Sequence, residues 1–160
     1  MRRKGVREAV TGIALAVGIT VASGIGLPVG AGLRADAAIA AEGTTPAPKG
    51  AAVYFQAPQD GQRVPRRFTV RIGLRDMGVA PAGVAIAGTG HHHVLIDAEA
   101  PAAGEPIPAD FNHIHLGNGQ TEVELTLTPG RHTLQLVVGD HRHMPHQPPV
   151  QSPKITVTVY

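Results

Sequence analysis

The residues best suited to chemistry in this chain are its nine histidines, which all lie between His91 and His146. Six of them form three pairs whose members are two residues apart: His91 and His93, His113 and His115, and His141 and His143. Side chains two residues apart on a β-strand project from the same side, roughly 7 Å apart. Imidazole is the commonest metal ligand in proteins, and its pKa lies near neutrality. The spacing therefore suggests a metal or proton site.

The composition restricts the metal that such a site would hold. The chain contains no cysteine, so the ligands must be nitrogen and oxygen atoms. Nitrogen-rich sites of this kind suit Zn(II), Cu(II) or Ni(II), and intrinsic affinity favours Cu(II). Cu(II) or Zn(II) is the cofactor that we expect, with no organic cofactor. The candidate ligands are the three pairs, an aspartate at strand spacing from the first pair and one later histidine: His91, His93, Asp97, His113, His115, His141, His143 and His146.

A structural role for the histidines is the main alternative, because a histidine in a β-protein is often a hydrogen-bonded structural residue. His132 follows a Pro-Gly turn and shares its face with three aliphatic residues, so we expect it to bond backbone atoms at the edge of the core. His92 shares a face with Val94 and Ile96, and its role stays open. Asp97 also fits a polar residue that ends a strand, and pH sensing or ligand binding are further possibilities.

The elements that must position these residues are short strands. Alternating apolar and polar residues, separated by Gly, Pro, Asn and Asp turns, indicate about seven strands. No helical period is found after the N-terminal segment. The pattern predicts an all-β domain, an immunoglobulin-like antiparallel sandwich, with a jelly roll or small barrel as alternatives. The expected strands are 52–57, 67–75, 91–97, 111–116, 121–128, 132–138 and 154–160, with His141, His143 and His146 on a Pro-rich loop.

The N-terminal segment predicts export. Arg2, Arg3, Lys4 and Arg7 precede an apolar stretch, and small residues near position 40 offer cleavage sites, which is typical of a secretory signal peptide. We expect a signal peptide over 1–40, a flexible Pro-rich linker over 41–50 and a domain over 51–160. An uncleaved membrane anchor is the alternative. After cleavage we expect no membrane span and a periplasmic or extracellular protein.

Charge and motif content exclude several classes of function. The whole chain has a net charge of +2, but residues 1–40 carry five basic and two acidic side chains, which leaves −1 on the remainder. That balance gives no basic surface for nucleic acid. The sequence contains two serines, Ser23 and Ser152, and neither lies in a nucleophile motif. Glu122 and Glu124 fit a solvated strand face better than a catalytic pair. We assign no catalytic residue and favour binding over catalysis.

Several segments resemble a bacterial family of domains of unknown function, DUF4399. The resemblance implies an exported domain with a sandwich fold and no established activity, and its triple-histidine motif is specific. It covers essentially all of 51–160 and is carried by residues 59–65, 77–83, 90–97 (GHHHVLID), 112–122 (NHIHLGNGQTE), 129–136 and 141–149.

Taken together, these features predict a bacterial cell-envelope domain that binds a divalent metal through histidine pairs, for carriage or sensing. The alternative is an interaction module that contacts another envelope protein and whose histidines are structural.

Overall fold

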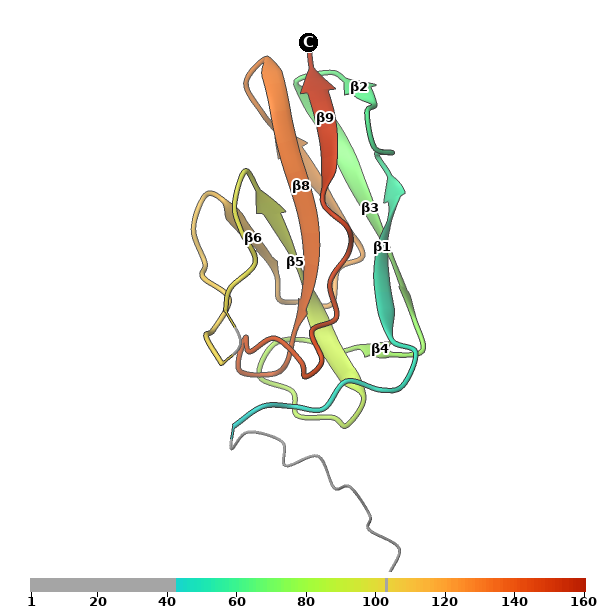
Figure 1. Cartoon of the computed structure of the whole chain (residues 1–160), viewed down its shortest axis with the longest axis vertical. Coiled ribbons are helices and arrows are strands. Elements are labelled where there is room, and N and C mark those ends of the chain that lie inside the picture. The colour runs from blue at the N-terminus through green and yellow to red at the C-terminus, as the bar shows by residue number, and fades with distance from the viewer. Residues whose placement is uncertain (1–42, 103) are drawn as a thin grey trace, which may run out of the picture. The chain divides into compact units, whose positions relative to one another are not determined.

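Nine strands and no helix make up the part of the chain that the structure, a computed structural model, describes: residues 43–102 and 104–160 (Figure 1). The expected signal peptide lies outside these residues. Within them, no helix is long and apolar enough to cross a membrane. The strands are β1 (Ala52–Ala57), β2 (Arg63–Val64), β3 (Arg67–Arg75), β4 (Gly78–Val79), β5 (Thr89–Ile96), β6 (His113–Leu116), β7 (Glu122–Thr126), β8 (Gly130–Gly139) and β9 (Ile155–Val159).

The strands form two sheets, which confirms the predicted immunoglobulin-like sandwich. One sheet has the order β1-β3-β7, and the other has the order β2-β9-β8-β5-β4, with β6 also paired to β5. All seven expected strands are present, with ends within two residues of the predicted ones. The two additional strands, β2 and β4, have two residues each and pair in parallel with β9 and β5. They are too short for an alternating pattern to reveal them.

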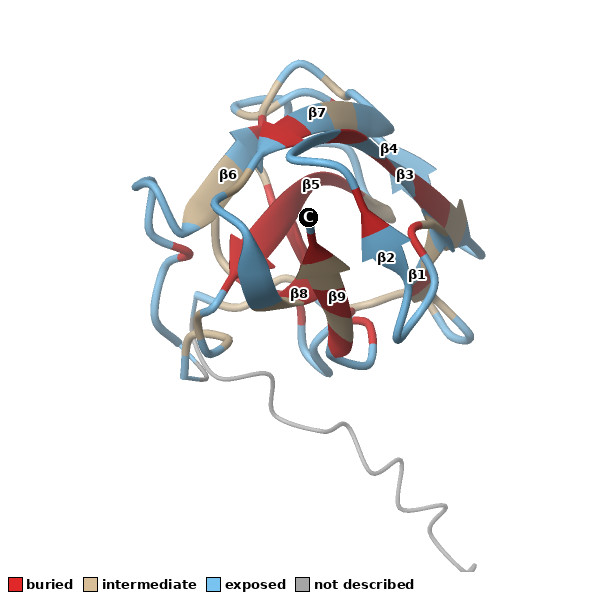
Figure 2. Cartoon of the chain, turned by 90° about the horizontal axis from the view of Figure 1, so that it is seen from above, coloured by how far each residue is buried: buried red, intermediate tan, exposed pale blue. Residues whose placement is uncertain are grey.

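The main core lies between the sheets, as Figure 2 shows by the buried segments that face each other. On β3 the alternation works as expected: Phe68, Val70 and Ile72 are buried, whereas Arg67, Thr69 and Arg71 are exposed. Those arginines pair across to β7, where Arg71 Nε lies 3.4 Å from a carboxylate oxygen of Glu122. The glutamates of β7 therefore belong to a solvated strand face. On the opposite sheet, β5, β8 and β9 contribute fully buried aliphatic residues to this core, Val94, Leu134, Leu136, Val138 and Val157.

The six-stranded sheet is also covered on its outer face, where a second apolar cluster forms. Leu95 of β5 and Val137 of β8 point away from the main core, and Ile107 packs against them from the loop between β5 and β6. All three are at most 4% exposed. Strand β5 is consequently buried on both faces from Gly90 to Ile96. A strand buried on both sides has no polar outer face, so any polar residue on it must find a partner inside the protein.

Part of the segment that we expected to be a flexible linker is bonded to the domain. The amide of Ala47 donates to the carbonyl of Gln147 at 2.9 Å, and the amide of Gln147 donates to the carbonyl of Thr45 at 2.9 Å. Pro46 and Gln147 form a parallel bridge. Residues 43–48, called the strap below, therefore lie along the loop that follows β8. The sequence gives no local signal of these contacts, because the backbone partners of the strap are about a hundred residues away.

The second apolar cluster can be tested by truncating Ile107. Ile107→Ala should lower the free energy of unfolding by about 2–5 kcal/mol, because it leaves a cavity under the loop between β5 and β6. Chemical denaturation measures the change. Ile86→Ala is the control, since Ile86 is 57% exposed and its truncation should change stability by less than about 0.5 kcal/mol. Equal effects of the two substitutions would mean that the outer face is not a packed core.

Candidate metal centre

Four imidazoles meet on the outer face of the six-stranded sheet. His91 and His93 come from β5, His115 from β6, and His143 from the loop after β8; these four are called the histidine cluster below. The ring centroids of its members are 4.7 to 5.9 Å apart. The Nε2 atoms of His91 and His93 are 3.0 Å apart, and those of His115 and His143 are 3.2 Å apart. One ring nitrogen from each of His91, His115 and His143 lies within 4.8 Å of the other two.

Strand geometry explains three of the four positions. His91 and His93 share the outer face of β5 because they are two residues apart, whereas His92 points to the main core, with its Nδ1 3.0 Å from the carbonyl of Gln120. His115 joins them because it pairs directly with His93 in the antiparallel β5–β6 ladder. Directly opposed residues of a ladder have Cβ atoms about 4.5–5.5 Å apart, which brings the two imidazoles side by side.

Two glycines leave room for the rings. Gly139 ends β8 opposite His91, and a Cβ at this position would lie 3.1 Å from Nε2 of His93. A Cβ at Gly117 would overlap the ring of His115. A larger residue at Gly117 would force the ring of His115 to move, and one at Gly139 would press against His93. The glycines are therefore part of how the sequence builds this site.

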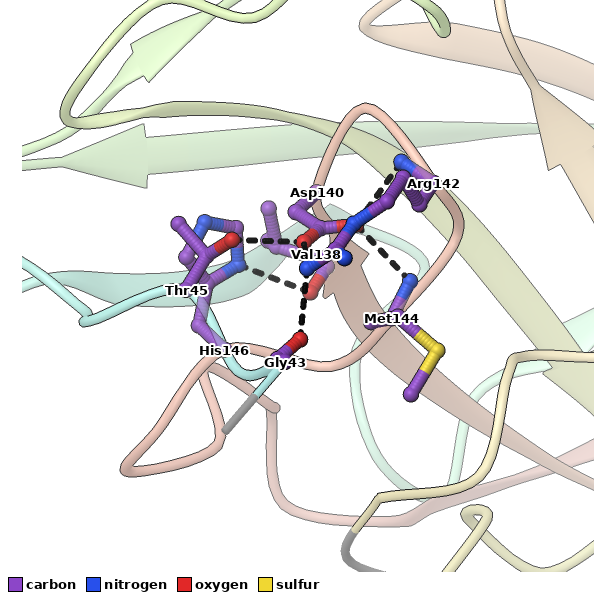
Figure 3. Close-up of polar contacts among 7 residues, drawn as sticks. All are labelled: Gly43, Thr45, Val138, Asp140, Arg142, Met144 and His146. Carbon is purple, nitrogen blue, oxygen red and sulfur yellow. Dashed lines mark hydrogen bonds and ion pairs between the residues drawn. The ribbon is translucent and has the colours of Figure 1, made fainter. Parts of the chain in front are cut away.

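His143 reaches the cluster through an unusual backbone conformation. Its φ angle is +67°, in the left-handed region, which costs a residue other than glycine on the order of 1 kcal/mol. Such strain persists where surrounding contacts hold it, often at functional sites. The contacts here come from Asp140, whose carboxylate accepts hydrogen bonds from the amides of Arg142 at 2.8 Å and Met144 at 3.0 Å (Figure 3).

Burial keeps the inner imidazoles neutral. Desolvation, together with the smaller effect of the neighbouring imidazoles, lowers the pKa of His91 to about 4 and that of His93 to about 2. Burial and the nearby His143 lower the pKa of His115 in the same direction. Neutral imidazole is the form that binds metal. At neutral pH His91 and His93 are therefore already in the protonation state that a metal ion requires.

The cluster leaves hydrogen-bonding capacity unused. The Nδ1 atoms of His91 and His93 are buried and have no hydrogen-bond partner. An unsatisfied buried polar atom costs about 1–3 kcal/mol, so native proteins usually provide a partner, a water molecule or an ion. A metal ion fits this donor set because it binds ring nitrogens that carry no proton. The residues present are thus suited to a nitrogen-ligated metal.

Four of the eight expected ligands lie outside this group, and each has other contacts or surroundings. Asp97 ends β5 and accepts hydrogen bonds from His132 and from the amide of Thr133 at 2.7 Å. His113 bonds Asp110 through Nδ1 at 2.8 Å. His141 lies beside the strap, together with Thr45 and residues 85–87. His146 is buried with its Nδ1 3.3 Å from the carbonyl of Val138.

Asp140 fixes the turn that carries His143, a role that we did not predict from the sequence. Its carboxylate is buried, with 1% exposure. Burial alone would raise the pKa of Asp140, but hydrogen bonds from Thr45 and from the amides of Met144 and Arg142 lower it. An aspartate at the start of a loop often accepts a hydrogen bond from the amide two residues later. Asp140 follows Gly139 at the start of such a loop, which is the local signal in the sequence for this turn.

His132 forms an ion pair that gives the first pH-dependent prediction. Its Nδ1 is 2.6 Å from Asp97 and its Nε2 is 2.9 Å from the carbonyl of Thr128, so both nitrogens face acceptors and the protonated ring can donate to both. Burial opposes this charge, but the bond to Asp97 raises the pKa of His132 above 6.5. Burial would also raise the pKa of Asp97, yet the bonds from His132 and Thr133 lower it below 3.8.

Asp97→Asn should therefore destabilise the protein most between about pH 4 and pH 6.5. Protonated His132 stabilises the fold fully at pH values below its pKa in the unfolded chain, and this effect is lost as pH rises through its higher pKa in the folded protein. Ionised Asp97 stabilises the fold at pH values above its pKa in the unfolded chain, and this effect is lost as pH falls through its lower pKa in the folded protein. The pair is partly exposed, so the difference should be on the order of 1 kcal/mol. Urea denaturation at several pH values measures it, and a difference that grows toward pH 9 would contradict the pairing.

The cluster predicts the opposite pH dependence for the metal-free protein. Between pH 6.5 and about 4 the unfolded chain protonates His91 and His93, whereas the folded chain keeps them neutral. Stability is then complete above pH 6.5 and is lost as pH falls, by about 1.4 kcal/mol per pH unit for each such histidine. Denaturation with a chelator present should show a shallower slope for His93→Gln than for the unaltered protein. Identical slopes would show that His93 is not buried neutral.

The chain is similar to one protein family and to two solved structures. Residues 70–160 match the model of the family described as "Domain of unknown function (DUF4399)". No curated protein matches the chain. Among solved structures, an endo-beta-1,4-mannanase from Thermotoga petrophila matches with 17% identity and a TM-score of 0.41 over 69% of this chain and 20% of that one. This chain therefore spans about a fifth of the mannanase's length.

Fibronectin(III)-like modules of Clostridium thermocellum CbhA match with 12% identity and a TM-score of 0.34, over 68% of this chain and 93% of that one. The match to the family model is of a different kind, because it extends from β3 to the C-terminal residue and includes every member of the histidine cluster. Since that match covers more than half of the sequence, the chain belongs to the DUF4399 family.

Proposed function

We propose that this domain binds one divalent transition-metal ion through the histidine cluster, with His91, His115 and His143 as ligands and His93 as a fourth imidazole beside them. The observation that carries the proposal is the convergence of three ring nitrogens within 4.8 Å. Two further facts support it: burial keeps His91 and His93 neutral, and their Nδ1 atoms have no hydrogen-bond partner.

Copper(II) is the ion that the donor set favours over zinc(II). The cluster offers nitrogen ligands alone, because the chain has no cysteine and the carboxylates of Asp97 and Asp140 are hydrogen-bonded to other residues. Nitrogen ligands bind Cu(II) more tightly than Zn(II) in the intrinsic affinity order. A neutral donor set also leaves the charge of the ion uncompensated, which favours release to a competing site.

Carriage or sensing in the cell envelope is the role that we infer. Export rests on the basic and apolar pattern of residues 1–40, and a domain that exchanges a metal needs no general acid or base beside it. The two inner imidazoles provide the buried part of the site, while His115 is exposed and gives an incoming ion a route from solvent. We therefore place the domain among exported metal-binding proteins rather than among enzymes.

An envelope interaction module is the second candidate, and one observation favours it. Phe111, just before β6, is 97% exposed, and it borders an apolar hollow with Ile114 and His115. A fully exposed aromatic side chain beside a hollow is typical of a contact surface for another protein. In that case the histidines would be structural, and metal would be irrelevant to function.

Titration of the purified, untagged protein with Cu(II) and Zn(II) separates the two candidates. We expect one ion per chain, with Cu(II) bound more tightly. Loss of a residue that only hydrogen-bonds a metal ligand weakens metal affinity by roughly 10- to 100-fold. Because His115 and His143 are themselves proposed ligands, His115→Ala and His143→Ala should each weaken binding by at least that much. His113→Ala is the matched control, because His113 lies on the same strand but bonds Asp110. It should keep the affinity of the unaltered protein. Absence of binding, or equal losses in all three variants, would favour the interaction module.

A further inference from the structure

His143 differs from the other members of the histidine cluster because no strand holds it. Its position depends on a turn that begins at Asp140. The amide of His143 donates to the carbonyl of Asp140 at 2.9 Å, and the amide of Asp140 donates to the carbonyl of Met144 at 2.8 Å. One carboxylate oxygen, Oδ1, accepts from the amides of Arg142 and Met144, the two neighbours of His143. Four hydrogen bonds of a single residue thus fix the backbone on both sides of the ligand.

The other carboxylate oxygen of Asp140 bonds the strap. Oδ2 accepts a hydrogen bond from the hydroxyl of Thr45 at 2.5 Å and lies 3.5 Å from Nη2 of Arg142, which also donates to the carbonyl of Gly43 at 2.5 Å (Figure 3). The strap is bonded a second time through the backbone ladder between Thr45, Ala47 and Gln147. The buried carboxylate of Asp140 therefore connects its own turn to Thr45 of the strap, which lies 95 positions earlier in the chain.

This arrangement argues against Asp140 as a metal ligand and for a role through His143. Both of its oxygens accept hydrogen bonds, and its side chain is only 1% exposed while the strap is bound. If the strap leaves, Oδ2 loses the hydroxyl of Thr45 and Arg142 loses the carbonyl of Gly43, so the carboxylate can turn toward the released guanidinium. A rotated carboxylate would release the amides beside His143, whose left-handed backbone needs them.

We propose that the strap regulates the metal site, with Asp140 as the positioning residue that transmits its binding to His143. The inference rests on the proposed metal-binding function. When the strap is bound, Asp140 holds His143 among the other imidazoles; when the strap is detached, the site loses one ligand. Coupling between two sites is reciprocal, so metal bound at the cluster also holds the strap against the domain. The chain segment that leads into the domain thereby senses whether the metal is present.

Thr45→Val in the full-length chain tests this coupling. Valine keeps the shape of threonine but cannot donate to Asp140. Titration with Cu(II) should show an affinity at least about 5-fold lower than that of the unaltered protein, the lower end of typical coupling between sites. Thr69→Val is the matched control, because Thr69 is exposed on β3 in the other sheet, and its affinity should be unchanged. Asp140→Ala, which removes both acceptor oxygens, should weaken binding by roughly 10- to 100-fold, whereas Asp60→Ala, which removes only a bond to the amide of Thr156 in β9, should not.

Amide hydrogen exchange distinguishes coupling from a purely structural role of Thr45, because without coupling metal would not change exchange in the strap. Saturating Zn(II) should slow exchange at Ala47, whose amide bonds Gln147, by at least about 5-fold. The amide of Leu127, which bonds Arg66 beside the other sheet, is the control and should exchange as before. In Thr45→Val the slowing at Ala47 should shrink together with the affinity.

Each outcome decides between the proposals. Weaker Cu(II) binding by Thr45→Val, with metal-dependent protection of Ala47, supports the coupling. If the unaltered protein binds Cu(II), His143→Ala loses it and Thr45→Val binds as tightly as the unaltered protein, the metal site stands and the strap has no part in it. If the unaltered protein binds no metal at all, both the proposed function and this inference fail.

Discussion

The structure depends on the burial of strand β5 on both of its faces. One face supplies Val94 and Ile96 to the core between the sheets, and the other is covered by Ile107 and by the loop after β8. An imidazole on the covered face is removed from water, which favours its neutral form. His91 and His93 are both placed there, next to each other and beside two further imidazoles. Burying two such groups is unfavourable unless something binds their nitrogens, and in the proposed function that partner is a metal ion.

The site combines a rigid half with an adjustable half. His91, His93 and His115 are fixed by the β5–β6 ladder and by the packing of the sheet. His143 is held by a turn, and that turn is held by one carboxylate that also bonds the strap. Proteins that exchange a ligand often place it partly on a segment of low local stability. If the proposed metal binds, a ligand on such a turn gives this domain a way to change its affinity without disturbing the sandwich.

Much of the fold could be predicted from the sequence, because alternation on strands such as β3 and β8 reports directly which side chains face the core. The same alternation correctly placed His91 and His93 together on one face of β5. It could not separate His113 from His115, since both project from the same face of β6; the difference is that Asp110 lies within reach of His113 alone. It also grouped Asp97 with the first pair, although the left-handed backbone of Asp97 ends the strand and turns its carboxylate to His132. Contacts between distant loops, such as Thr45 with Asp140, leave no periodic signal at all.

Anomalous diffraction from crystals of the full-length protein loaded with one equivalent of Cu(II) tests the central claim most directly. Data collected at the copper absorption edge should give a single strong peak in contact with ring nitrogens of His91, His115 and His143. Such a peak would identify the ion and its ligands in one experiment. A peak at His113, His132 or His141, or none on the outer face of the six-stranded sheet, would contradict the assignment of the histidine cluster as a metal centre.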